Sequence, residues 1–545
     1  MSQEHKITGK LVDIHKQSIY GATIFYEQEG KIQRIERNDH AEGPYILPGF
    51  VDSHIHIESS MLTPQNFARE AVQHGTIGTI SDPHEIANVL GEEGIDTMLK
   101  DAAQTPFKFF FGVPSCVPAT PFETSGAVLD STIVDRLLQR SEFYYLAEMM
   151  NFPGVIHQDP EVMKKLASAQ ANNKPIDGHV PGLQGKDLDT YIQAGITTDH
   201  ECGNYDEAVE KIKKGMKIQI REGSAARDFD NLYALIDQYP DDVMLCSDDK
   251  HPDDLIQGHI NRLVKIGLDK GLDLFHMLKA AILNPVAHYK IPVGLLREND
   301  PADFILVDDL TNFQVKATYI NGTKVFDNDG VYFKVHSIDY PNIMNAKNLN
   351  KGLIQVSDKN QPVKVIEARD RTLYTSYVNA NLPSKDGLLQ SDLAQDILKI
   401  VVLNRYQEQA PSIGFIKNFG LQHGALATSV AHDSHNIICV GVDDASIVSA
   451  VNEIIRLGGG NVVLDATKNT TLPLEFGGLM ADNSAETVAK RYTQLNEHAS
   501  LLGCKLDAPF MTLAFMALPV IPELKITDQG LFDVNQFQYT SLYTE

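Results

Sequence analysis

The pattern of apolar and polar positions divides the chain of 545 residues into three regions. Residues 1–45 alternate apolar and polar positions in short runs broken by glycine and charge, which is typical of β-strands. From about residue 46 to 295, short apolar runs alternate with helical patterns, which favours βαβ units around a parallel sheet. After residue 296 the strand pattern returns, and from 361 onward strand-like and helical runs are mixed.

Eight strand-like runs stand in the central region, and helical patterns separate them. One helix is expected to begin after Thr63 as N-cap, with Pro64 at its first position, and to end at Gly75. Eight strand–helix units in a region of this length match a (β/α)8 TIM barrel, for which ~250 residues is typical. A doubly wound open sheet is the alternative, but no glycine-rich phosphate loop follows the first strand. The runs are 46–52, 76–80, 107–113, 143–147, 174–177, 196–199, 216–220 and 243–247.

The segments that flank the barrel region are expected to meet. Asn321-Gly322 stands between two β-like runs and predicts a tight hairpin turn. Residues 1–45 and 296–340 therefore predict one small β-domain, a β-sandwich, that brackets the barrel. The polar stretch 341–360 predicts a linker.

The third region, 361–545, predicts a C-terminal α+β domain of mixed α and β structure. Helical patterns at 389–404 and 444–458 alternate with the apolar runs IICVGV and NVVLDA. The fold class is thus α/β, with the barrel at its centre.

Composition narrows the class of protein further. Hydrophobic content is 43% and charged content 22%, both ordinary for a globular chain that is too long for one domain. The net charge of -25 argues against a nucleic-acid-binding surface, because backbone binding needs clustered Lys and Arg. It does not argue against a nucleobase, which is neutral.

The cysteines and the N-terminus indicate the compartment. The five cysteines are odd in number and form no C-x-x-C pair, which favours reduced thiols in a cytosol. No apolar signal segment opens the chain and no run of 18 apolar residues exists, so we expect a cytoplasmic protein without a membrane span. The cysteines are Cys116, Cys202, Cys246, Cys439 and Cys504.

Side chains that can bind metal follow nearly every predicted barrel strand. In FVDSHIHIESS, His54 and His56 stand at i and i+2, so in a strand they point to the same face. By itself this pair is also compatible with two surface histidines. In a barrel, however, the residues after the strands meet at one mouth. They are His54 and His56, Asp82 and His84, Ser115 and Cys116, Glu148, His179, His200 and Glu201, Arg221 and Glu222, and Asp248 and Asp249.

Four imidazoles and two carboxylates of this set form a candidate ligand group without thiolate, which suits Zn, Mn or Fe(II). A bound metal lowers the pKa of water toward ~7, and a nearby carboxylate can carry the released proton to a leaving group. Asp248, at the end of the eighth strand, is placed for that role. Glu148 can bridge two ions with its two oxygens.

At these motifs the sequence resembles the bacterial-type adenine deaminases of the amidohydrolase superfamily, and the resemblance covers nearly the whole chain. H-x-H alone fits any hydrolase of the superfamily, whereas the long opening motif and Glu148 within LAEMMN are specific. The barrel motifs are LPGFVDSHIHIESSMLTP, ISDPHEIANVLG, LAEMMNFPGV, DGHVPGL, TTDHE, CSDD and ILNPVAHY. The C-terminal motifs are SVAHDSHNI, LPLEFGGLMAD and FMALPVIPELKITDQGLFDV.

The resemblance implies hydrolysis of adenine, a cyclic amidine, to hypoxanthine and ammonia in purine salvage. It implies that metal-bound hydroxide attacks C6 while Asp248 acts as proton shuttle. Many binuclear relatives bridge their metals with a carboxylated lysine on strand four; Glu148 stands there instead, which fits the adenine deaminase subgroup. The resemblance further implies a homo-oligomer, either dimer or tetramer. Its implied ligands for a binuclear Mn or Fe(II) centre, with Zn possible, are His54, His56, Glu148, His179, His200 and Asp248.

Further residues are expected to act on the substrate. Glu201 is a catalytic candidate. Glu201 and Glu123 are also candidates to hydrogen-bond the purine ring nitrogens, with helix capping or loop contacts as the alternative. His84 is a catalytic candidate that would polarise the attacking hydroxide or steady the purine. Ser115, after the third strand, joins the substrate-binding candidates.

The segment SVAHDSHNI carries His432, Asp433 and His435. An H-D-x-H cluster can bind metal, close over a substrate pocket, or form an ordinary polar loop before the strand IICVGV. If it contributes to the site, the third region acts as a lid over the barrel mouth.

Other functions remain possible from the residues alone. The same metal site could hydrolyse a cyclic amide or an N-acetyl group. A non-catalytic barrel scaffold is disfavoured because all six candidate ligands are present. A nucleic-acid-editing zinc deaminase is disfavoured because the chain lacks the C-x-x-C that such enzymes use.

Overall fold

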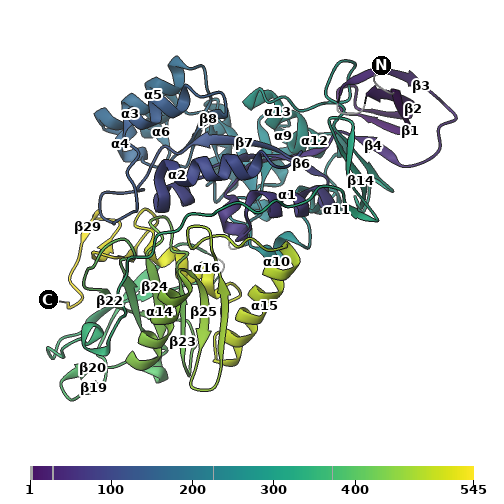
Figure 1. The fold of residues 1–545 in the computed structure, drawn as a ribbon. Coiled ribbons are helices and arrows are strands. Elements are labelled where there is room, and N and C mark those ends of the chain that lie inside the picture. Colours follow the sequence, from purple (N-terminus) through teal and green to yellow (C-terminus); the bar gives the residue numbers. More distant parts are fainter. Residues whose placement is uncertain (1–3, 28–29, 225, 371, 545) are drawn as a thin grey trace.

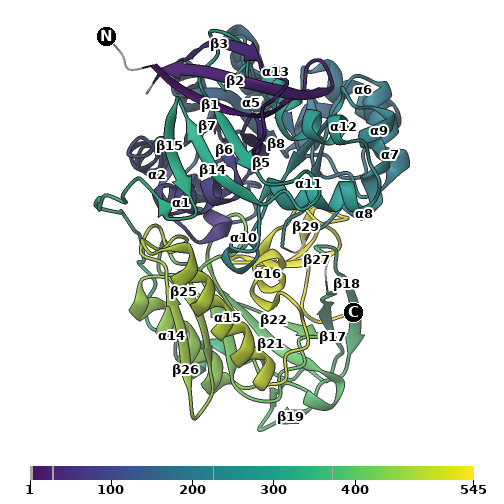
Figure 2. The same cartoon turned by 90° about the vertical axis from the view of Figure 1, so that its right-hand side faces the viewer.

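The structure is a computed structural model that describes residues 4–27, 30–224, 226–370 and 372–544. Figures 1 and 2 show a small N-terminal sheet beside the central barrel region, with the C-terminal region packed against the barrel from below. Within the described residues, no helix combines the length and the apolar character that crossing a membrane requires.

The two segments that flank the barrel pair into one eight-stranded sheet, in the order β16-β15-β14-β13-β4-β1-β2-β3. Asn321 and Gly322 form the predicted two-residue hairpin, and both have positive φ (49° and 76°), as a type I′ turn requires. Buried residues of both segments, including Ile24 and Phe304, share one apolar cluster. The strands are β1 (Glu4–Asp13), β2 (Ser18–Glu27), β3 (Ile32–Arg37), β4 (Tyr45–Leu47), β13 (Phe304–Val307), β14 (Val315–Ile320), β15 (Thr323–Asp327) and β16 (Gly330–Val331).

The predicted barrel appears as eight parallel strands. They pair as β5-β6-β7-β8-β9 and β10-β11-β12. Backbone bonds join these two sets: Thr197 N–H donates to Ile176 O (2.9 Å), and Asp248 N–H donates to His54 O (3.0 Å). The strands are β5 (Phe50–Ile55), β6 (Thr76–Ser81), β7 (Lys108–Val113), β8 (Phe143–Met149), β9 (Ile176–Gly178), β10 (Thr198–Asp199), β11 (Lys217–Arg221) and β12 (Val243–Cys246).

The run predicted as one strand at 46–52 is in fact divided between two sheets. Its start belongs to β4 of the small sheet, and its end belongs to β5 of the barrel. Pro48 lacks a backbone N–H and cannot continue a ladder. Gly49 lies so close to Ile77 that a Cβ there would be 2.5 Å from its side chain. The chain therefore changes sheets at this dipeptide.

Helices surround the barrel strands (Figure 1). The helix predicted from Thr63 to Gly75 is confirmed: α1 begins at Pro64, continues as a 3-10 turn, and ends at Gly75 with φ of 76°. The α-helices are α1 (Pro64–Ala71), α2 (His84–Ala102), α3 (Ser131–Leu138), α4 (Phe152–Ile156), α5 (Pro160–Ala171), α6 (Gly185–Gln193), α7 (Tyr205–Lys213), α8 (Phe229–Leu232), α9 (Ala234–Gln238), α10 (Pro252–Leu255), α11 (Ile260–Asp269), α12 (Leu274–Leu278) and α13 (Asn284–Tyr289). Shorter turns are η1 (Ile57–Ser60), η2 (Val72–His74) and the π-helical η3 (Lys279–Leu283).

The C-terminal region contains a second eight-stranded sheet, in the order β18-β17-β22-β21-β24-β23-β25-β26. Its strands are β17 (Val363–Glu367), β18 (Ser376–Ala380), β21 (Ile397–Leu403), β22 (Ser412–Lys417), β23 (Ala425–Thr428), β24 (Ile437–Gly441), β25 (Gly460–Leu464) and β26 (Asn469–Pro473). The helices are α14 (Asp444–Leu457), α15 (Ala485–Leu501) and α16 (Pro509–Ala514), with turns η4 (Lys351–Ile354), η5 (Leu393–Gln395) and η6 (Phe515–Ala517). Two small sheets contain β19 (Ser384–Lys385) and β20 (Leu388–Leu389), and β27 (Leu524–Thr527), β28 (Gly530–Asp533) and β29 (Gln538–Tyr539).

The helix predicted at 389–404 is wrong, whereas the helix predicted at 444–458 is confirmed as α14. Residues 397–403 form β21, which lies between β22 and β24 and is buried at all seven positions. Lys399 interrupts this apolar run, but its ammonium group is buried. It donates to Ile354 O (2.9 Å) and pairs with Asp444. A strand covered on both faces has no alternating pattern, so periodicity could not separate it from a helix.

The predicted linker at 341–360 contains only the short turn η4 and is held against the C-terminal region. Asn345 N–H donates to Arg405 O (2.7 Å). The barrel also bonds directly to the C-terminal region, since Ala481 N–H donates to Met61 O (2.9 Å) and Asn66 donates to Asp482 (3.0 Å). These bonds fix the C-terminal region over one end of the barrel.

Candidate metal centre

The C-terminal ends of the barrel strands converge on one buried cavity. The barrel supplies imidazoles and carboxylates to its lining, including His56, His179, Glu148 and Asp248. The C-terminal region supplies His432, Asp433 and an apolar face, so it covers the barrel mouth as the lid hypothesis expected. The apolar lining residues of that region are Leu373, Phe515, Leu518, Val520 and Ile521.

The two histidines of the opening motif point to one place. His54 Nε2 and His56 Nε2 are 3.2 Å apart, and they lie 3.5 and 3.3 Å from Asp248 Oδ1. His56 Nδ1 is 3.2 Å from the carbonyl oxygen of Asp82, so Nδ1–H donates there and the Nε2 lone pair faces the cavity. Two imidazole nitrogens and a carboxylate oxygen at these separations fit a shared cation.

Glu148, in β8, lies between this group and a second pair of histidines. Its Oε1 is 3.4 Å from His56 Nε2, while its Oε2 is 3.2 Å from His200 Nε2 and 2.7 Å from His179 Nδ1. Burial alone would raise the pKa of Glu148, but His179 and His200 hold it well below its usual range. An ionised carboxylate whose oxygens face two groups of imidazoles has the geometry of a bridge.

The donor set fits two divalent cations. The potential ligand atoms of His54, His56 and Asp248 lie within 4.8 Å of one another, and so do those of His54, Glu148 and His200. All of these side chains are buried. Nitrogen and oxygen donors without thiolate suit Mn, Fe(II) or Zn.

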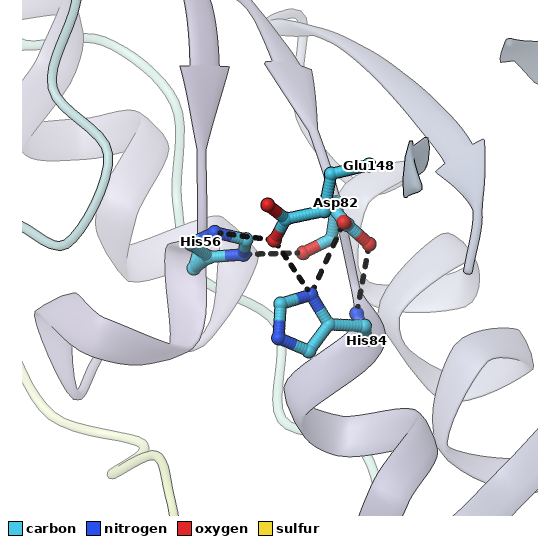
Figure 3. A group of neighbouring side chains, drawn as sticks. All are labelled: His56, Asp82, His84 and Glu148. Atoms are coloured by element: carbon cyan, nitrogen blue, oxygen red, sulfur yellow. Dashed lines mark hydrogen bonds and ion pairs between the residues drawn. The ribbon is translucent and has the colours of Figure 1, made fainter. Parts of the chain in front are cut away.

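His84 adjoins the group, at the start of α2. Figure 3 shows His84 with Asp82, His56 and Glu148. His84 Nδ1 is 3.1 Å from Asp82 Oδ2 and 3.4 Å from Glu148 Oε1. Burial lowers the pKa of His84, but Asp82 and Glu85 outweigh it and raise that pKa well above its ordinary value. The predicted catalytic residue therefore does lie at the cavity, beside Glu148.

Arg221, at the end of β11, holds both predicted catalytic carboxylates, a role that the sequence did not indicate. Its Nη2 donates to Glu201 Oε2 (2.9 Å), and its Nη1 donates to Glu201 Oε1 and to Asp248 Oδ2 (3.0 Å). Burial would raise the pKa of Asp248, but His54, His56 and Arg221 hold it well below its usual range. Asp248 also has a left-handed backbone (φ 52°), an uncommon conformation that clusters at functional sites.

Glu85 is a second residue that sequence reasoning missed, although it stands in the quoted motif beside His84. Its Oε1 accepts from His432 Nδ1 (2.6 Å), and its Oε2 accepts from His435 Nε2. His432 and Asp433 line the cavity, whereas His435 lies behind them. No local signal could have shown these bonds, because Glu85 and His432 are 347 positions apart.

Three of the five predicted substrate-binding residues, Ser115, Glu123 and His435, do not line the cavity. The Ser115 hydroxyl donates to the backbone carbonyl of Glu148, so Ser115 supports the backbone at the end of β8. Glu123 accepts from Thr120 N–H (3.2 Å), and burial, with Asp433 adding to it, raises the pKa of Glu123 well above its ordinary value. The role of Glu123 toward a ligand stays a prediction.

A buried lysine connects the two strand ends that carry the predicted ligands His179 and His200. Lys211 Nζ donates to Asp199 Oδ2 (2.8 Å), Glu207 Oε1 (2.6 Å) and Val180 O (2.7 Å). Asp199 Oδ1 in turn accepts from Val180 N–H (2.9 Å). Because Val180 follows His179 and Asp199 precedes His200 in the chain, this network sets the spacing of that histidine pair.

We expect Lys211→Ala to lower the free energy of unfolding by about 3–5 kcal/mol, because it leaves Asp199 and Glu207 as buried charges without their partner. Urea unfolding followed by circular dichroism measures the change. The exposed neighbour Lys213→Ala serves as the control and should stay within about 0.5 kcal/mol of the parent. Equal losses in both variants would contradict a structural role for the Lys211 network.

The barrel and its cluster of imidazoles and carboxylates define an amidohydrolase: residues 45–325 match the amidohydrolase family. Residues 372–538 match the adenine deaminase C-terminal domain. The chain belongs to the adenine deaminase family. It is 53% identical to an adenine deaminase of Methanosarcina acetivorans over 99% of this chain and 100% of that protein. It is 48% identical to one of Salinibacter ruber over the full length of both.

Among solved structures, a β-aspartyl dipeptidase of Fervidobacterium islandicum is 15% identical and covers 62% of this chain and 100% of its own, with a TM-score of 0.48. The family assignment rests instead on the sequence matches. They confirm the resemblance that the motifs indicated.

Proposed function

We propose that this protein hydrolyses adenine to hypoxanthine and ammonia. One observation supports this above all: the chain is 48–54% identical, over nearly its whole length, to proteins named adenine deaminase. The cavity agrees with that chemistry, since it combines a metal-binding group with an apolar face that a flat purine can contact.

The proposed metal ligands are those that converge in the cavity. His54, His56 and Asp248 would hold one cation, His179 and His200 would hold the second, and Glu148 would lie between them. We propose Mn or Fe(II) in these positions, with Zn compatible with the same donors. When bound, such cations supply a water molecule whose pKa is lowered toward ~7.

Asp248 is proposed to move the proton. Its Oδ2 is fixed by Arg221 at 3.0 Å, while its Oδ1 faces His54 and His56, so the carboxylate cannot turn away from the cavity. It would take a proton from water as the C6–O bond forms. It would deliver that proton to N1, and it would then pass the remaining proton of the C6 hydroxyl to the amine as the C6–N bond breaks, so that C6=O forms and ammonia leaves.

The remaining polar residues are proposed to orient the purine. Burial alone would raise the pKa of Glu201, but Arg221 and the nearby histidines hold it below its usual range. An ionised carboxylate accepts hydrogen bonds, so its partner on the base is an N–H group. His84 would polarise the attacking water or steady the ring, and His432 and Asp433 would contact the ring from the C-terminal side.

Ammonia release tests the proposed activity. With added Mn, purified protein should release ammonia from adenine far faster than from adenosine. A dihydropyrimidine and an N-acetylated sugar are tested in parallel, because they represent the other amidohydrolase reactions. Turnover of either of these, with none of adenine, would overturn the proposal.

Removal of metal is expected to abolish the reaction. After dialysis against a chelator, ammonia release from adenine should fall to background, and addition of two equivalents of Mn or Fe(II) per chain should restore it. Metal analysis of the same samples gives the stoichiometry. Full activity in metal-free protein would contradict the assignment of the six ligands.

We also propose a setting for the enzyme: purine salvage in the cytoplasm, as a homodimer or homotetramer, without nucleic-acid or membrane partners. We propose three domains, namely 1–45 with 296–340, 46–295, and 361–545. Because β4 (Tyr45–Leu47) pairs with both β1 and β13, it supports joining the two segments of the first domain, with the boundary to the barrel after residue 47 instead of 45.

A further inference from the structure

Glu85 lies where the barrel meets the C-terminal region. Its side chain is 2% exposed and contacts groups on both sides of that boundary. On the barrel side, Glu85 Oε1 is 3.5 Å from His84 Nε2, and His84 Nδ1 is 3.4 Å from Glu148. On the other side, Glu85 accepts from His432 and His435, which are 3% and 1% exposed. A continuous chain of contacts thus joins the bridging carboxylate to the C-terminal region.

The protons of this cluster can be assigned from its neighbours. Ala431 N–H donates to His435 Nδ1 (3.2 Å), so in neutral His435 the proton is on Nε2 and is donated to Glu85 Oε2. His432 Nδ1–H donates to the other oxygen. Burial would raise the pKa of Glu85, but both imidazoles hold it well below its usual range. Glu85 is therefore an anion whose two oxygens are both used across the domain boundary.

The loop that Glu85 holds supports the apolar face of the cavity. The ring of His432 stacks on Phe515, with centroids 4.3 Å apart and an interplanar angle of 20°. Phe515, Leu518, Val520 and Ile521, together with Leu373, line the same cavity as the polar barrel residues. We call these five residues the apolar wall. A purine has apolar faces and a polar edge, so it needs both sides of this cavity.

We propose that Glu85 is a positioning residue: through His432 and His435 it holds the apolar wall over the barrel mouth, and the wall binds the ring of the substrate. The assignment of the ligand as a purine rests on the proposed function. Glu85 also lines the cavity, but both of its carboxylate oxygens accept from the two imidazoles. Its removal should therefore weaken substrate binding more than it slows the chemical step.

Steady-state kinetics on adenine tests this directly. Glu85→Ala should raise KM at least about 10-fold, with a smaller fall in kcat and with metal content unchanged. Glu85→Gln should recover part of the loss, because its amide oxygen still accepts from one imidazole. Phe515→Ala should also raise KM, since it removes the residue of the apolar wall that stacks on His432. Glu93→Gln, an exposed residue of the same helix, is the matched control. An unchanged KM in Glu85→Ala would overturn the proposal.

Hydrogen–deuterium exchange provides a readout that does not depend on activity. Relative to the parent protein, Glu85→Ala should take up deuterium several-fold faster at 431–436 and at 515–521. If this occurs in a protein that does not deaminate adenine, the proposed function fails while the positioning role stands. If uptake at both segments stays unchanged, the positioning role fails. If instead the parent binds a third metal equivalent that Glu85→Ala loses, the cluster is a metal site and the proposal is wrong.

Discussion

Replacing Asp248 by asparagine is expected to lower kcat for adenine by about 10³-fold while the protein stays folded and keeps its metal. General acid–base catalysis contributes roughly 10²–10⁴-fold, and asparagine has no carboxylate to accept the proton. The amide oxygen can still act as a ligand. Asparagine also tolerates the left-handed backbone of this position, where φ is 52°. Ammonia release and metal analysis on the same preparation measure both effects.

The exposed Asp96→Asn variant is the control for this substitution, and it should behave like the parent. Turnover near the parent value in Asp248→Asn would show that another group moves the proton. Glu201 would be the first candidate, since Arg221 holds it beside Asp248. Loss of metal in Asp248→Asn would show that the residue acts chiefly as a ligand.

Glu148→Ala is expected to bring the metal content below two ions per chain and to lower activity by at least about 10²-fold. Loss of a residue that only supports a ligand costs roughly 10–100-fold in metal affinity or activity, and a carboxylate shared by both cations should cost no less. The variant also leaves His56, His179 and His200 without the anion that faces them. Metal analysis after gentle purification, together with ammonia release, measures the outcome.

Glu142→Ala is the matched control, because Glu142 is about half exposed and lies just before the same strand. It should keep both ions and full activity. Two ions per chain in Glu148→Ala would remove its bridging role. In that case His84 and Asp82, which contact each other, would be the alternative ligands of the second cation.

The bonds made by Arg221 and Glu85 explain why the roles of these two residues could not be predicted from the sequence, although Arg221 was expected at the barrel mouth. Arg221 stands at the end of a barrel strand, and Glu85 follows the predicted residue His84 at the start of a helix. A charged residue in either place is usually exposed to solvent or caps the helix. Their roles depend on partners brought in from elsewhere: Asp248 for Arg221, and His435 for Glu85. The spacing of residues along the chain does not indicate which distant residues form such pairs.

The sequence by itself determined the central barrel and the six candidate ligands. Parallel strands of a barrel end at one mouth, so residues that follow successive strands must converge there. Short-range rules also held: Thr63 and Gly75 bound one helix, and Asn321 with Gly322 makes the hairpin. These features depend on local backbone preferences and on the repeated strand–helix unit. Both can be recognised from residues that are close together in the sequence.

Only the tertiary structure decided how the C-terminal region completes the cavity. It showed β21 as a buried central strand, because burial on both faces removes the periodicity that distinguishes strand from helix. It also brought the apolar wall and the predicted metal ligands to one cavity, where Glu85 contacts groups of both regions. Contacts between segments hundreds of residues apart arise from packing of whole domains, and no local pattern specifies them.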